Sequence, residues 1–104
     1  MGTQERTPEQ HAVFLRTTQL IGIKLRTLRK RHSFTQTSLA RCAGLHKSNI
    51  CRAERGGHMP TLPFLRAYAD GLGVDAHTVA VAVLEIVEAG FRQEQALGPK
   101  PDWK

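Results

Sequence analysis

The spacing of small and apolar residues between Gln36 and Gly56 constrains the fold of this chain more than any other feature of its sequence. The first, fifth, ninth and fifteenth positions of this segment hold Gln36, Ala40, Gly44 and Ile50. An alanine at the fifth position lets one helix cross close over another. A glycine at the ninth position can adopt the left-handed backbone that ends a helix. The segment therefore predicts two short helices that pack across a tight turn.

Helical patterns continue on both sides of this segment, and the sequence predicts an all-α chain. Thr7-Pro8-Glu9-Gln10 has the form of a capped helix start, with a hydroxyl cap, an initial proline and a glutamine three residues later. Thr35, His46 and Thr61 are expected to cap three later helices. The expected helices run from Pro8 to near Arg31-His32 (one long helix or two abutting ones), over 36–42, over 47–54, from Thr61 to a stop at Gly71 and Gly73, and from residue 75 or 78 to about 97.

The charge of the chain favours an anionic partner. Its 104 residues suffice for one domain with a modest core. Fifteen Lys and Arg residues against nine Asp and Glu give a net charge of +6. Such an excess is typical of proteins that bind nucleic acids, although basic surfaces also occur on proteins that bind nothing anionic. The sequence has no membrane-spanning apolar stretch and no secretion signal, so we expect a cytoplasmic protein with no membrane partner.

The two cysteines, Cys42 and Cys51, are too few for a disulfide scaffold. Together with His46 they raise the possibility of a metal or redox sensor. Their spacing matches no recognised zinc motif, however, and a fourth ligand would have to come from His32 or His58. Buried cysteines that act as small hydrophobes are the commoner case. Because the sequence also lacks any catalytic signature, we expect no metal, no cofactor and no enzymatic activity.

The segment from residue 21 to 79 resembles the Cro/CI-type helix-turn-helix family, also called the XRE family. The matching residues, in order, are Ile21-Gly22, Leu25-Arg26, Leu28-Arg29, Thr35-Gln36, Leu39-Ala40, Ala43-Gly44-Leu45, Ile50, Glu54, Gly56, Pro60, Leu62, Leu65, Ala69 and Leu72-Gly73-Val74. The resemblance implies a lambda-repressor-like bundle of five helices with an extended C-terminal helix. It also implies binding to double-stranded operator DNA, usually as a two-fold dimer, with the second helix of the motif in the major groove.

On this basis the chain divides into four parts. They are an N-terminal helical extension at 1–18, the DNA-binding domain at 19–78, a C-terminal helix at 79–97 that serves as a dimerisation element, and an irregular tail at 98–104. The resemblance assigns base contacts to the start and exposed face of the second motif helix, namely Lys47, Ser48, Asn49 and Arg52. The alternative for each of these four residues is that its side chain is solvated at the surface or contacts a phosphate.

Phosphate contacts are implied around the motif, where helix N-termini and bare backbone can approach an anion. The residues concerned are Thr35, Gln36, His46, Arg55 and Gly57. Gln36 is also expected to buttress the second motif helix. The resemblance further implies a partly buried salt bridge between Arg29 and Glu54, which fixes the angle of that helix through two parallel hydrogen bonds.

The last helix is apolar over most of its circumference, which predicts that it is covered on two sides. We expect its stripe to form a homodimer interface through Val79, Val83, Ile86, Val87 and Phe91. The alternative is that the N-terminal helix covers the stripe within one chain.

The predicted function is a transcriptional repressor that binds a palindromic operator as a homodimer. Two rivals are an antitoxin or phage accessory protein whose last helix binds a partner protein, and a sensor of metal, oxidation or a small ligand.

Overall fold

The computed structural model describes residues 6–97, which form five α-helices and, within that range, no strand. The helices are α1 (Pro8–Arg31), α2 (Gln36–Ala43), α3 (Lys47–Glu54), α4 (Leu62–Leu72) and α5 (Ala76–Leu97). The predicted all-α class is confirmed, and α1 is one continuous helix that passes without a break through the boundary expected after residue 18. The expected irregular tail and the first five residues of the expected extension lie outside the described residues.

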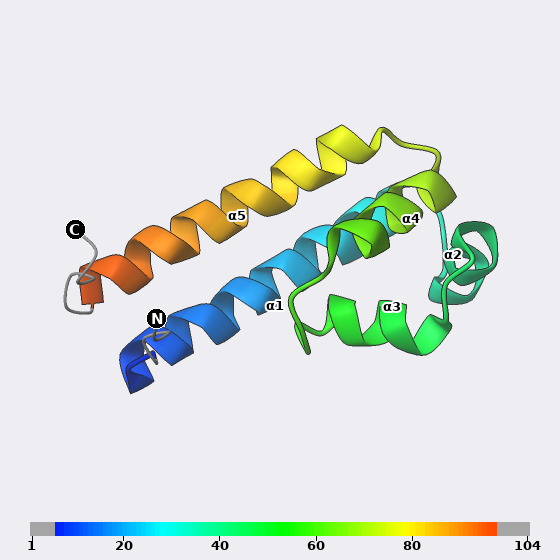
Figure 1. Ribbon diagram of the computed structural model, residues 1–104. Coiled ribbons are helices and arrows are strands. Elements are labelled where there is room, and N and C mark those ends of the chain that lie inside the picture. Colours follow the sequence, from blue (N-terminus) through cyan, green and yellow to red (C-terminus); the bar gives the residue numbers. More distant parts are fainter. Residues whose placement is uncertain (1–5, 98–104) are drawn as a thin grey trace.

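The two long helices, α1 and α5, run antiparallel side by side along the length of the molecule (Figure 1). The short helices α2, α3 and α4 gather at one end of this pair, and the pair extends well beyond them at the other end (Figure 1). No helix among residues 6–97 is long and apolar enough to cross a lipid bilayer.

Local capping interactions explain where most of these helices begin. Thr7 forms a capping box with Gln10 at the start of α1, and Thr35 forms one with Ser38 at the start of α2. The hydroxyl of Thr61 accepts a hydrogen bond from the Phe64 amide at the start of α4. These three predicted caps are confirmed.

The expected cap at His46 is wrong. His46 occupies the N-cap position of α3, but its side chain makes no capping hydrogen bond. A cap requires an acceptor on a short side chain that can reach the second or third amide of the helix, and the exposed imidazole does not supply one. The start of α3 is therefore not closed by a side chain of its own N-cap residue.

Glycines end α2 and α4, although one of those predicted for α4 has another role. Gly44 and Gly73 take left-handed backbone with φ of 67° and 75°, which L-residues with a Cβ adopt only at a cost. Gly71 was expected to help end α4 but lies inside the helix. A Cβ there would sit 2.7 Å from the Ala43 Cβ and 2.8 Å from Leu39 Cδ1. Gly71 thus allows the close packing of α4 on α2.

The core is a single apolar cluster to which every helix contributes. Its fully buried members include Ile21 and Leu25 of α1, together with Leu39, Ile50, Ala53, Tyr68 and Ala69 from the three short helices. Val79 and Val83 of α5 belong to the same cluster, with exposed fractions of 1% and 5%. These two residues were expected at a dimer interface, and the structure corrects this expectation. The amphipathic stripe of α5 is covered first by the chain itself, as in the alternative interpretation.

Candidate nucleic-acid interface

The helix that should read DNA, α3, is held by an unusually close approach to α1. A Cβ placed on Gly22 of α1 would clash with the backbone carbonyl oxygen of Glu54 and would lie 2.7 Å from that of Ala53. Backbone cannot move aside as a flexible side chain can. The absence of a side chain at Gly22, together with the small side chain of the fully buried Ala53, therefore sets the distance between the two helices.

A buried ion pair fixes the orientation of α3 on α1. Arg29 Nε donates to Glu54 Oε2 at 2.8 Å and Arg29 Nη2 donates to Glu54 Oε1 at 2.9 Å. Arg29 Nη1 donates a third hydrogen bond, of 2.8 Å, to the carbonyl oxygen of Phe34 in the α1–α2 connection. The salt bridge implied by the resemblance is thus present, in the bidentate form that constrains direction as well as distance.

Two further side chains complete this network around Glu54. The hydroxyl of Tyr68 in α4 lies 2.8 Å from Glu54 Oε2 and 2.7 Å from the Leu25 carbonyl oxygen, two acceptors that compete for its single proton. Gln36 Nε2 donates to Glu54 Oε1 at 3.1 Å. Through these contacts the last residue of α3 is tied to α1, α2 and α4. The expected buttressing by Gln36 is present, and its expected phosphate contact remains a prediction.

The network keeps its members in the charge states that it needs. Burial alone would raise the pKa of Glu54, but the hydrogen bonds from Arg29, Tyr68 and Gln36 outweigh burial and lower it. The hydrogen bond to Glu54 raises the pKa of Arg29, against the opposing effect of burial. Burial and then the hydrogen bond to Glu54 raise the pKa of Tyr68, so its hydroxyl stays a donor. Tyr68 was not among the site residues expected from the sequence. The signal that pointed to more was its phenol, since a buried hydroxyl needs a partner.

The opposite edge of α3 faces solvent. The residues expected to contact bases are exposed in the case of Lys47, Ser48 and Arg52, and half-buried in the case of Asn49. Among the residues expected to contact phosphates, Thr35, His46, Arg55 and Gly57 are exposed and Gln36 is half-buried. The same short segment, from the start of α2 to the loop after α3, therefore carries all nine. Their contacts with DNA stay predictions.

A shallow hollow of about 360 Å³ lies beside α3 and was not anticipated from the sequence. Asn49 and Arg52 line one side of it, and His58 and Phe64 line another. The His58 and Phe64 rings meet edge to face, with centroids 6.3 Å apart. Asn49 lines this hollow, which accounts for its partial burial.

The exposed charges along the segment from α2 to the loop after α3 are all positive. Between Glu9 and Asp70 the sequence contains a single acidic residue, Glu54, and this carboxylate is buried and neutralised by Arg29. Lys47, Arg52 and Arg55 are exposed on or next to α3. Because Glu54 is the only carboxylate between α2 and the loop after α3 and is itself neutralised, these cations give this segment a positive potential suited to a polyanion.

A metal centre finds no support at the same place. Cys42 is exposed on α2 and Cys51 is half-buried on α3, and both thiols are free. Within residues 6–97, no three His, Cys, Asp or Glu side chains gather closely enough to hold a metal ion. The metal hypothesis based on Cys42, His46 and Cys51 therefore lacks a ligand set in this part of the chain.

Comparison with known proteins agrees with this arrangement. A family model described as a helix-turn-helix domain matches residues 20–82, more than half of the chain. The immunity repressor protein of Bacillus phage phi105 is 32% identical over 76 residues, which cover 73% of this chain and 49% of the phage protein. The chain thus spans about half the length of that curated relative.

Among solved structures, the restriction-modification controller protein C.AhdI from Aeromonas hydrophila superposes with a TM-score of 0.55 and 26% sequence identity. The match covers 96% of the controller protein but only 62% of this chain, so this chain carries additional structure beyond the shared domain. These relatives are regulatory proteins by name. With a family model matched over more than half its length, the chain belongs to the helix-turn-helix domain family, the class of DNA-binding regulators that the sequence predicts.

Proposed function

We propose that this protein is a transcriptional repressor that binds operator DNA as a homodimer, with α3 of each copy in the major groove. The observation that carries the proposal is the contrast between the two edges of α3. One edge is locked to the rest of the chain by Glu54 and Gly22, and the other presents Lys47, Ser48 and Arg52 to solvent. A rigidly held helix with a free polar edge is what base readout requires.

The residues on that edge have the chemistry for the task. Lysine and arginine suit the O6 and N7 acceptors of guanine, and asparagine pairs with adenine through two hydrogen bonds. The exposed cations on and next to α3 attract the phosphate backbone and supply affinity that does not depend on sequence. Repression requires only that a bound dimer occludes a promoter, and an immunity repressor is among the similar proteins. Acting on DNA, such a protein would be cytoplasmic and need no enzymatic activity.

The test separates base readout from backbone contact. Binding sites are first selected from random duplex DNA, and affinities are then measured for the selected operator and for each single-base variant of it. Arg52→Ala is expected to cost about 1–3 kcal/mol on the operator and to remove discrimination at one position of each half-site. Gln36→Ala is expected to weaken all duplexes alike. Equal losses for both variants on every sequence would contradict the assignment of Arg52.

A second function is favoured by one specific observation, the exposed apolar side chains on α5. Leu84 and Phe91 are 55% and 52% exposed and are suited to a partner protein, as in an antitoxin or a phage accessory factor. Such a protein would still bind DNA through α3. Co-expression with the product of the adjacent gene, followed by isolation of a stoichiometric complex that depends on Leu84 and Phe91, would favour this alternative.

A further inference from the structure

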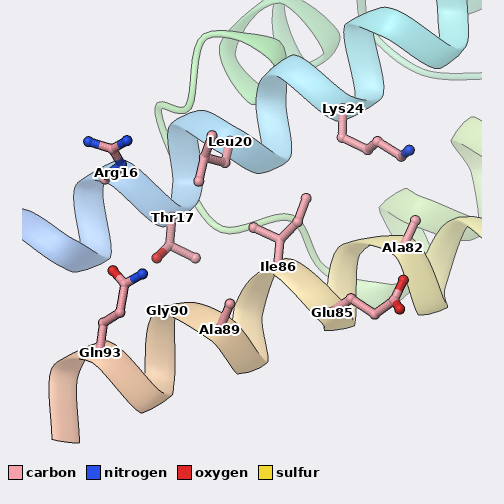
Figure 2. A pocket seen from close by; sticks show the side chains of 10 residues that line it. All are labelled: Arg16, Thr17, Leu20, Lys24, Ala82, Glu85, Ile86, Ala89, Gly90 and Gln93. Atoms are coloured by element: carbon pink, nitrogen blue, oxygen red, sulfur yellow. The ribbon is translucent and has the colours of Figure 1, made fainter. Parts of the chain in front are cut away.

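A shallow groove runs between α1 and α5, and all the residues that line it belong to these two helices (Figure 2). Its volume is about 380 Å³. Leu20 of α1 and Ile86 of α5 lie at its centre, and Ala82 and Ala89 form the α5 side. Leu20 is 43% exposed. The groove therefore presents apolar side chains that residues 6–97 leave partly exposed.

The groove exists because α1 and α5 approach each other closely near one of its ends. A Cβ on the buried Gly90 would clash with the side chain of Thr17 on α1. The Thr17 hydroxyl donates to the Val13 carbonyl oxygen of its own helix at 2.8 Å, which keeps this contact compact. Because α5 has a glycine at this contact and alanines beside it, its side chains project little into the groove. A helix from another molecule can therefore come close to α5.

The rims of the groove carry opposite charges. Lys24 on α1 and Glu85 on α5 lie at the same end of the groove, on opposite sides of it (Figure 2). Neither has an ion-pair partner among the described residues, whose ion pairs are Arg6–Glu94, Arg29–Glu54 and Arg66–Asp70. A partner that complements this face needs an apolar centre flanked by a cation and an anion in exchanged positions.

We propose that the occupant of this groove is the same groove of a second copy of the chain. A two-fold axis along the groove lays α1 of one copy over α5 of the other, because this operation exchanges the two sides of the face. Leu20 of each copy then meets the Ala82 and Ala89 wall of the other, and Lys24 faces Glu85 twice. A self-complementary patch of this kind is the requirement for an isologous dimer. The inference rests on the homodimer of the proposed function and specifies its surface.

The first test is the molar mass of the full-length protein without DNA, measured by light scattering and sedimentation over a range of concentrations. The wild type is expected to be a dimer. Leu20→Glu is expected to be a monomer, because it places two carboxylates at the apolar centre of the interface. The matched control is Leu84→Glu on the same pair of helices. Leu84 precedes Ile86 by two residues and thus lies about 200° away around α5, so this variant is expected to stay dimeric.

The second test exchanges the charges and does not depend on any loss of folding. Lys24→Glu and Glu85→Lys are each expected to raise the dimer dissociation constant about tenfold or more, because each sets like charges opposite one another. The double variant is expected to return the constant to within about threefold of the wild type. A monomeric wild type, a dimeric Leu20→Glu, or a double variant no better than the singles would each overturn the inference. Because no DNA is present, these outcomes are independent of whether α3 reads an operator.

Discussion

Glu54 is the residue on which the placement of α3 depends most directly, since it bonds to side chains from three other helices. Its position in sequence, at the end of the second motif helix, made the pairing with Arg29 predictable through the resemblance alone. Tyr68 and the carbonyl oxygen of Phe34 could not be predicted as members of the network. Tyr68 lies 14 residues away from Glu54 in the chain, and only the packing of α4 brings its hydroxyl to the carboxylate. The Phe34 carbonyl oxygen joins the network through Arg29, because the α1–α2 connection places it beside the guanidinium.

The lowered pKa of Glu54 makes the stability of the protein depend on pH in a stated direction. Glu54 binds a proton less readily in the folded chain than its ordinary pKa of 4.5 implies. It therefore stabilises the fold above about pH 4.5, and this contribution is lost as the pH falls through the lower folded value. Glu54→Gln is expected to cost about 3–5 kcal/mol at neutral pH, because it leaves Arg29 buried without a counter-charge. Urea unfolding between about pH 7 and pH 3 is expected to show this cost shrinking with acidity.

The control for this prediction is Asp70→Asn. Asp70 pairs with Arg66 at 3.7 Å, but both side chains are largely exposed, so the ion pair contributes little in water. The unfolding free energy of Asp70→Asn is expected to match that of the wild type at every pH. If the unfolding free energies of Glu54→Gln and the wild type differed by the same amount throughout the acidic range, the role given to the carboxylate would be contradicted.

At the scale of helices, the sequence was informative wherever the interaction that positions an element is local. The caps at Thr7, Thr35 and Thr61 bond to amides three residues away, so their spacing could be read directly. The role of Gly71 could not, because it depends on α2 lying across α4. The burial of Val79 and Val83 within the same chain could not be predicted from the sequence either. An apolar stripe is equally compatible with a helix of the same chain and with one of a second copy.

At Gly22, where α1 crosses α3, we expect an alanine to change the unfolding free energy in the direction opposite to that given by helix propensity. Alanine in place of glycine inside a helix normally stabilises it by about 1 kcal/mol. At Gly22 the added methyl would meet the carbonyl oxygens of Glu54 and Ala53, and such overpacking costs about 1–3 kcal/mol. Gly22→Ala is therefore expected to lower the unfolding free energy and, by displacing α3, to weaken operator binding.

A matched variant distinguishes this displacement from a general loss of stability. Gly73 has a φ of 75°, and a Cβ added to it would have no neighbouring atom within 4 Å, so Gly73→Ala strains the backbone at the end of α4 without adding a contact to α3. It is expected to destabilise the protein without changing operator affinity under conditions where the chain stays folded. Equal affinities for the Gly22→Ala variant and the wild type would show that the α1–α3 spacing does not control how α3 is presented.

At the scale of the whole molecule, the acidic residues are concentrated in the last third of the chain. Apart from the neutralised Glu54, the acidic residues between 6 and 97 are Glu9, Asp70, Asp75, Glu85, Glu88 and Glu94, so most lie from the end of α4 onward. The segment around α2 and α3 is left basic. The sequence contains this uneven distribution, but its consequence for the groove between α1 and α5 depends on the two helices lying side by side (Figure 1).

The proposed dimer would link dimerisation to operator recognition, and it leads to a prediction for DNA with one or two half-sites. A two-fold operator places its half-sites about 34 Å apart, and only a dimer engages both at once. On a duplex with one half-site, Leu20→Glu is expected to bind as the wild-type protomer does, because Leu20 lies in the groove and away from α3. On the full operator its affinity is expected to fall about 10²-fold or more, because the second contact is no longer intramolecular. Fluorescence anisotropy on both duplexes measures the difference. An equal loss on the two would instead place the effect of Leu20 on the protomer itself, and no loss on either would mean that the dimer binds its operator through another surface.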